Sequence, residues 1–174
     1  MKIPFLSFES SNQQIKSEIL SSFEHFFDSS WYVLGDQVKQ FEEEYAAFNH
    51  VKHCIGVSNG LDALHLALKA LDIGKGDEVI VPSNTYIATA LAVSYVGATP
   101  VFVEPNIKTY NIDAAKIGAA ITSKTKAIMP VHLYGQACEM ESVMTIAKNH
   151  HLFVVEDNAQ SQGATYKGKL TGSW

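Results

Sequence analysis

After residue 50, short apolar runs alternate with longer segments in which apolar residues recur every three or four positions. The short runs predict strands at residues 53–57, 78–81, 99–103, 126–131 and 152–156. The longer segments predict helices at residues 60–71, 85–96, 114–121 and 139–150. Strands that are apolar at nearly every position and alternate with helices are typical of a parallel sheet covered on both faces. The fold class expected is therefore α/β, with three layers in the order α/β/α around a mostly parallel sheet.

The first fifty residues have a different pattern. Residues 12–27 and 37–48 read as helices joined by 28–36, which contains Trp31, Tyr32 and Gly35. We expect an N-terminal helical segment over 1–50, lying against the sheet or a partner subunit. The α/β domain is expected over 51–174, with a short hairpin at 165–169.

Composition narrows the class of protein further. The chain has 174 residues, a formal net charge of −5 and 47% hydrophobic residues. The negative charge argues against a nucleic-acid surface, and no apolar run approaches the roughly 20 residues of a membrane span. Neither a secretory signal nor a zinc-ligand spacing is recognisable, and Cys54 and Cys138 form no C-x-x-C pair. A reduced, cytoplasmic compartment fits best.

All thirteen basic residues are lysines. Without a guanidinium group, any bound phosphate or carboxylate must be held by lysine, hydroxyls, amides or backbone N–H groups.

In an open parallel sheet, ligands bind beyond the carboxyl ends of the strands. Gly60 and Leu61 follow the first predicted strand and open a helix, where free backbone N–H groups favour a phosphate. The alternative is that Asn59 merely caps this helix. Tyr86 follows the second strand, where its ring could stack on a flat heteroaromatic ligand or simply pack on the sheet edge.

Asp157 follows the last predicted strand, where a buried carboxylate needs a cation or hydrogen-bond donors. A protonated pyridine nitrogen is one suitable partner, and nearby backbone N–H groups are the other. His132 follows the strand at 126–131 and is a weak candidate for lining the same cleft, since a histidine there is more often packed.

Taken together, several segments resemble the DegT/StrS-type nucleotide-sugar aminotransferases. The resemblance runs from about Pro4 to Trp174, with the order and spacing of the motifs kept. The motifs are 57–64 (Val-Ser-Asn-Gly-Leu-Asp-Ala-Leu), 76–82 (Gly-Asp-Glu-Val-Ile-Val-Pro), 86–89 (Tyr-Ile-Ala-Thr), 130–136 (Pro-Val-His-Leu-Tyr-Gly-Gln) and 155–160 (Val-Glu-Asp-Asn-Ala-Gln).

The resemblance implies a partial large domain of the aspartate-aminotransferase type (fold type I), pyridoxal 5′-phosphate as cofactor, and a homodimer. It implies that Gly60 and Leu61 hold the cofactor phosphate and that Tyr86 stacks on its ring. Asp157 would pair with the ring nitrogen and Gln160 with the 3-hydroxyl. Residues 31–35, Trp-Tyr-Val-Leu-Gly, resemble the branch that aminates dTDP-linked 3-keto-6-deoxyhexoses in deoxyamino-sugar biosynthesis, with an amino acid as donor.

The family's Schiff-base lysine lies downstream of the Asp-x-x-Gln motif, and the printed sequence ends at Trp174, before that place. Lys167 and Lys169 come too early, so the expectation is a chain that lacks the catalytic lysine and the small C-terminal domain and is catalytically incomplete by itself.

Three other readings of the sequence stay open beside this one. They are a non-catalytic interaction module, the dehydratase branch of the same family, and a dinucleotide-binding dehydrogenase. The sequence around Gly56 and Gly60 lacks the G-x-G-x-x-G spacing expected of the last.

Overall fold

The computed structural model describes residues 3–174; residues 1 and 2, which begin the expected N-terminal segment, lie outside the described residues. The helices are α1 (Glu9–Asp28), α2 (Asp36–Phe48), α3 (Gly60–Ala70), α4 (Ile87–Tyr95), α5 (Ala114–Ala120) and α6 (Met140–Asn149), with a 3₁₀ turn at Leu133–Gly135. The strands are β1 (Glu78–Pro82), β2 (Thr99–Val103), β3 (Thr125–Ile128), β4 (Phe153–Val154), β5 (Thr165–Tyr166) and β6 (Lys169–Leu170).

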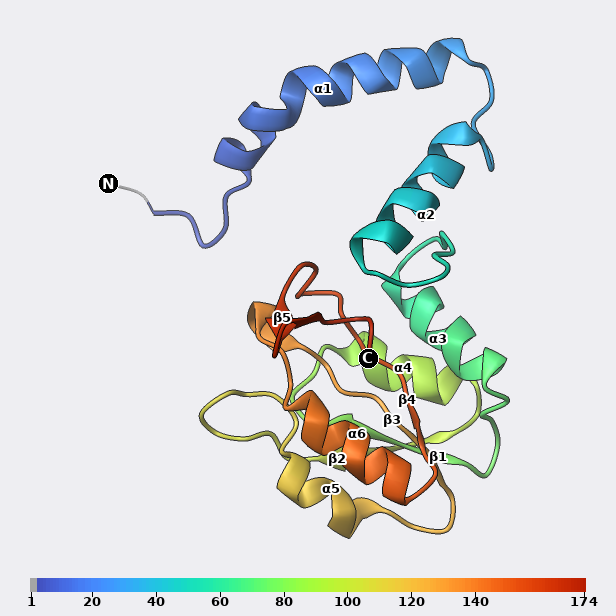
Figure 1. The fold of residues 1–174 in the computed structure, drawn as a ribbon, viewed down its shortest axis with the longest axis vertical. Helices are drawn as coiled ribbons and strands as arrows, with labels where there is room; N and C mark the ends of the chain where they lie inside the picture. The colour runs from blue at the N-terminus through green and yellow to red at the C-terminus, as the bar shows by residue number, and fades with distance from the viewer. Residues whose placement is uncertain (1–2) are drawn as a thin grey trace.

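The main sheet has four parallel strands in the order β2-β1-β3-β4. Side chains alternate between its faces, so neighbouring residues of β1 belong to separate cores. Val79 and Val81 pack with Leu68 and Val93 of α3 and α4. Ile80 packs on the other face against α5 and α6. Figure 1 shows these helix pairs on either side of the strands, which confirms the three-layer α/β/α prediction.

Local sequence signals mark the start of α3 and α5 and the end of α4. The side-chain oxygen of Asn59 accepts the N–H of Asp62 (2.9 Å) at the start of α3, and Asp113 does the same for Ala115 (3.1 Å) at the start of α5. Gly97, at φ +81°, ends α4 in the left-handed conformation that glycine adopts without strain. The expected hairpin forms from β5 and β6, which pair antiparallel.

The predicted strand at 53–57 is wrong. This segment has no strand pairing, and the N–H of Gly56 donates to Glu42 Oε1 (2.6 Å) instead of to a neighbouring strand. Ile55 is 78% exposed. An apolar run forms a strand only when another strand offers it a ladder, and none of the strands in residues 3–174 lies beside this one.

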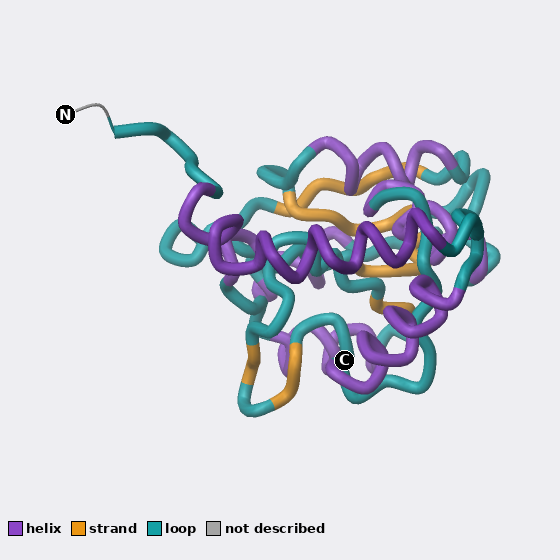
Figure 2. The backbone as a smooth tube through the Cα atoms, turned by 90° about the horizontal axis from the view of Figure 1, so that it is seen from above, coloured by secondary structure: helices purple, strands orange, loops and turns teal. Residues whose placement is uncertain are grey.

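The N-terminal helices form as predicted but do not lie buried on the sheet. None of the side chains of α1 is buried, and only Ala46 is buried in α2. Figure 1 shows α1 running clear of the sheet and joined to the body of the protein through α2, and in Figure 2, seen from above, the same long helix crosses in front of the body. The exposed side chains include Ile19, Phe23, Phe27 and Trp31, so this segment presents an extended apolar surface.

Helix α3 packs mainly on α4. The burial of its apolar side chains therefore differs strongly between its two sides. Leu68 is fully buried, whereas Leu66 on the same helix is 48% exposed. An apolar sequence over this helix therefore does not mean that each of its apolar side chains is buried.

The two leucines give a direct test of this packing. We expect Leu68→Ala to lower the free energy of unfolding by about 2–5 kcal/mol, because it leaves a cavity in the core between α3 and β1. Leu66→Ala is the matched control and should cost well under half as much. Urea unfolding followed by circular dichroism measures both, and equal losses would contradict the packing described.

Candidate functional site

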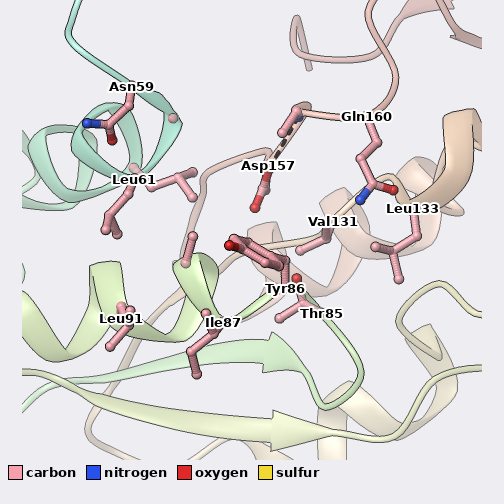
Figure 3. A pocket seen from close by; sticks show the side chains of 14 residues that line it. Asn59, Leu61, Thr85, Tyr86, Ile87, Leu91, Val131, Leu133, Asp157 and Gln160 are labelled. Atoms are coloured by element: carbon pink, nitrogen blue, oxygen red, sulfur yellow. Dashed lines mark hydrogen bonds between the residues drawn. The ribbon is translucent and has the colours of Figure 1, made fainter. Parts of the chain in front are cut away.

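A cavity of about 440 Å³ opens at the carboxyl ends of the strands. It is lined by the start of α3, the start of α4, the segment after β3 and the segment after β4. Gly60, Leu61, Tyr86, Asp157 and Gln160, the residues singled out from the sequence, all border it. Figure 3 shows Asp157 and Tyr86 near its middle, with Leu61 on one side and Gln160 on the other.

Asp157 is held at the strand ends by its own backbone. Its N–H donates to Pro130 O (2.9 Å), and its carbonyl accepts from His132 N (3.2 Å), which extends the parallel pairing of β3 and β4. The residue is 8% exposed. Its Oδ2 accepts the hydroxyl of Thr89 (2.7 Å), and its Oδ1 accepts the N–H of Ala159 (3.3 Å). Because a carboxylate can accept about four hydrogen bonds, acceptor capacity is left for a ligand in the cavity.

The start of α3 supplies donors at another part of the wall. Asn59 satisfies the N–H groups of Asp62 and Ala63. The N–H groups of Gly60 and Leu61 have no protein acceptor within residues 3–174. A Cβ built on Gly60 meets no atom within 4 Å, so the glycine faces open space. Free N–H groups, the positive end of the helix dipole and room for close approach together make an anion site.

Tyr86 and Gln160 border the cavity with side-chain groups that a ligand can contact. Tyr86 immediately precedes α4 and is 72% exposed, so its ring is free to contact a ligand. Gln160 Oε1 accepts the N–H of Tyr134 (2.8 Å). That bond fixes the amide and leaves Nε2 as a donor on the side of Asp157 and Tyr86 (Figure 3).

Electrostatics limits what this cavity can hold. Asp157 is the only charged side chain among the described residues that line it, and no lysine borders it. Lys167 pairs with Glu141, and Lys169 lies over the ring of Trp174. The cavity therefore suits a molecule that carries a cationic group near Asp157 and an anionic group near the start of α3.

His132 does not line the cavity, so that candidate assignment is wrong. The residue is fully buried, and its Nε2 lies 2.8 Å from Glu156 Oε2. The N–H of Cys138 donates to Nδ1 (3.0 Å), so Nδ1 carries no proton and Nε2 is the donor toward Glu156. Its neighbours Val131 and Leu133 face the cavity instead. In an extended chain, side chains alternate, and His132 falls on the far side.

Glu156 accepts several hydrogen bonds on the side of the strand end that faces away from the cavity. Its carboxylate accepts the N–H groups of Gly172 (2.8 Å) and Trp174 (2.8 Å) in addition to His132. Burial raises the pKa of Glu156, but the hydrogen bonds from His132, Trp174 and Gly172 outweigh it and hold the pKa below its usual value. Glu156 thus fastens the last residues of the chain to the end of β4, directly behind Asp157.

Sequence reasoning missed two residues of this region, Thr89 and Glu156. Thr89 lies in an apolar helix, and only its hydroxyl distinguishes it from its neighbours. Glu156 precedes the candidate Asp157 but has donors from residues 16 and 18 positions away, which local pattern does not relate to it. A buried polar residue on an otherwise apolar face is the one signal that could have identified Thr89.

Across residues 3–174, no group of three or more His, Cys, Asp or Glu side chains could hold a metal ion. No helix in that range combines the length and the apolar character needed to cross a bilayer.

Comparison with known proteins gives a consistent result. The profile of the DegT/DnrJ/EryC1/StrS aminotransferase family matches residues 13–174. A relative from Aneurinibacillus thermoaerophilus, dTDP-3-amino-3,6-dideoxy-alpha-D-galactopyranose transaminase, is 57% identical over 171 residues, which is 98% of this chain and 47% of the relative. The chain thus spans about half the length of the relatives that it matches.

Solved structures agree with the sequence comparison. The structure of DesV from S. venezuelae, in complex with a ketimine intermediate, superposes with a TM-score of 0.96 at 44% identity, over 99% of this chain and 47% of that one. NtdA from Bacillus subtilis, with bound cofactor PMP, superposes with a TM-score of 0.90 at 37% identity, over 98% of this chain and 39% of that one.

The Glu156 cluster predicts a pH dependence of stability. Because its pKa is lowered on folding, Glu156 stabilises the fold fully above its unfolded pKa of about 4.3, and this contribution is lost as pH falls through the folded pKa. We expect Glu156→Gln to lower the free energy of unfolding by about 1–3 kcal/mol at pH 7. The difference from wild type should narrow below about pH 4.

Urea unfolding at a series of pH values measures this difference. Glu43→Gln, at an exposed position of α2, is the control and should differ little from wild type at any pH. A Glu156→Gln deficit that persists undiminished to pH 3 would contradict the assignment.

Proposed function

The chain belongs to the DegT/DnrJ/EryC1/StrS aminotransferase family, and we propose that its cavity binds pyridoxal 5′-phosphate for the transamination of a nucleotide-linked keto-deoxy-sugar. The observation that carries this proposal is the pairing of opposite electrostatic features in one cavity. Asp157 offers a buried carboxylate, while Gly60 and Leu61 offer free N–H groups at a helix start. A protonated pyridine ring with a phosphate substituent needs both.

The five residues predicted from the sequence then each have a specific role. Asp157 pairs with the protonated ring nitrogen, and the N–H groups of Gly60 and Leu61 hold the phosphate. The ring of Tyr86 stacks on one face of the pyridine, and Gln160 Nε2 donates to the 3-oxygen. When bound, the cofactor supplies an electron sink for moving the amino group, and a charge at Asp157 keeps that sink effective.

Backbone anchoring of the phosphate follows from the composition. The chain has no arginine and no lysine borders the described cavity, so the helix start is the anion site that the described residues offer. The amine that would bond the cofactor covalently is likewise not among the residues that line this cavity. The described residues bind and orient the cofactor.

The proposed substrate is a dTDP-linked 3-keto-6-deoxyhexose, aminated in deoxyamino-sugar biosynthesis with an amino acid as donor. Support comes from the A. thermoaerophilus transaminase, which is 57% identical, and from residues 31–35, Trp-Tyr-Val-Leu-Gly.

We also propose that the protein is a cytoplasmic homodimer. The apolar surface of the α1–α2 segment supports the dimer, because α1 buries none of its side chains within one chain. A large exposed apolar surface marks a site of association. Cys54 and Cys138 are free thiols, which fits a reducing compartment.

Cofactor binding can be tested without the covalent step. Pyridoxamine 5′-phosphate carries its own amine, so it needs no lysine to bind. We expect saturable binding by equilibrium dialysis, weakened roughly tenfold or more by Asp157→Asn, which removes about 1.4 kcal/mol or more of ion pairing. Asp72→Asn, at an exposed carboxylate beyond the end of α3, is the matched control and should bind as wild type does. Equal affinity of wild type and Asp157→Asn would remove Asp157 from its proposed task.

The dimer is tested by size-exclusion chromatography with light scattering. We expect the mass of two chains for wild type and of one chain for Ile19→Asp/Phe23→Asp, since charges on this face of α1 oppose its burial. Ser21→Asp, on the other face of α1, should remain dimeric. A monomeric wild type would contradict the proposal.

A further inference from the structure

The hydroxyl of Thr89 is buried in a helix that otherwise buries small and apolar side chains. Thr89 is fully buried, and its neighbours in the core from α4 are Ala90, Ala92 and Val93. A valine has nearly the same shape, so packing alone does not require a hydroxyl here. Burying one without a partner is costly, and the partner it has is the carboxylate of Asp157, at 2.7 Å.

The direction of the hydrogen bonds follows from the number of protons. An ionised carboxylate can only accept, so the single proton of Thr89 Oγ1 is donated to Asp157 Oδ2. Thr85 Oγ1 lies 2.8 Å from Thr89 Oγ1, whose proton is already committed. Thr85 is therefore the donor in that pair. The chain of hydroxyls runs from Thr85 through Thr89 to Asp157.

This chain joins separate parts of the cavity wall. Thr85 borders the cavity and directly precedes Tyr86, while Asp157 lies across it at the strand ends. Thr89 donates to one carboxylate oxygen and Ala159 N to the other. Donors on both oxygens, from different elements, fix the plane of the carboxylate. The same hydroxyls tie the segment that carries Tyr86 to Asp157.

We infer that Thr89, supported by Thr85, is a positioning residue that acts through Asp157 and sets the carboxylate against the protonated ring nitrogen of the cofactor. The inference rests on the proposed function for its ligand and on the Thr85–Thr89–Asp157 contacts for its geometry. Thr89 itself lies outside the set of residues that border the cavity. Its effect on the ligand is indirect.

The first experiment measures pyridoxamine 5′-phosphate binding to Thr89→Val and Thr89→Ser. We expect Thr89→Val to bind roughly tenfold more weakly, the equivalent of about 1.4 kcal/mol. Thr89→Ser keeps the hydroxyl and should bind within about twofold of wild type, which is well below that 1.4 kcal/mol. Ser94→Ala is the control, because Ser94 lies in the same helix and its hydroxyl donates to Ala90 O (3.1 Å) and to no other group within residues 3–174. Wild-type affinity in Thr89→Val overturns the inference.

A second readout separates positioning from general loosening of the fold. The ultraviolet absorption of bound pyridoxamine phosphate reports whether its ring nitrogen is protonated. A poorly oriented carboxylate holds that proton less firmly, so in Thr89→Val the ring should lose it at a pH lower by roughly one unit, equivalent to about 1.36 kcal/mol. An unchanged titration midpoint in Thr89→Val would show a merely structural role and overturn the inference.

A third measurement needs no ligand and so separates this inference from the proposed function. In urea unfolding, Thr89→Val should lower the midpoint in the chain with Asp157. In the Asp157→Ala background, where the acceptor is gone, it should leave the midpoint unchanged or raise it. Equal losses in both backgrounds would mean that the hydroxyl does not act on the carboxylate. If wild type binds no pyridoxamine phosphate, the proposed function fails, while this cycle still decides whether Thr89 acts on Asp157.

Discussion

Asp157 places a carboxylate inside the protein. The segments around it are arranged so that they supply this carboxylate with hydrogen-bond donors. Desolvating a carboxylate costs several kcal/mol unless donors replace the water. Here the donors come from α4, through Thr89, and from the turn after β4, through Ala159. The parallel pairing of β3 and β4 fixes the backbone to which the group is attached. A wall of the cavity is thus assembled from elements that are distant in sequence.

Much of the fold could be predicted from the sequence because its signals are local. Strands that are buried on both faces appear in the sequence as apolar runs. The starts of helices are marked by capping residues such as Asn59 and Asp113. The failure at 53–57 has a physical cause, since a strand is defined by its partner and an apolar run says nothing of whether a partner exists. The same holds for α1, whose periodicity predicts a helix but not what covers its apolar side chains.

The candidate site also contains residues that local sequence signals could predict and residues that they could not. Tyr86 and Asp157 could be placed at the cavity because they follow strands, and the carboxyl ends of parallel strands meet at one edge. Gly60 was placed there after a predicted strand that does not form, and it borders the cavity as the first residue of α3. Whether His132 points into the cavity depends on which face of the strand end borders the cavity. The local sequence pattern does not reveal which face that is. Thr89 and Asp157 are 68 positions apart in the sequence, so their contact is seen only in the folded structure.

The alternation along the strand ends has an evolutionary consequence. Glu156 and Asp157 are adjacent acids with opposite surroundings: the first meets His132, Gly172 and Trp174, and the second faces the cavity. Only one peptide unit separates them. Inserting or deleting a single residue in or just before β4 would turn each side chain to the other face, so that a carboxylate with a longer side chain would enter the cavity. Divergence in this stretch should therefore proceed by substitution at constant length, while loops elsewhere on the surface are free to vary in length.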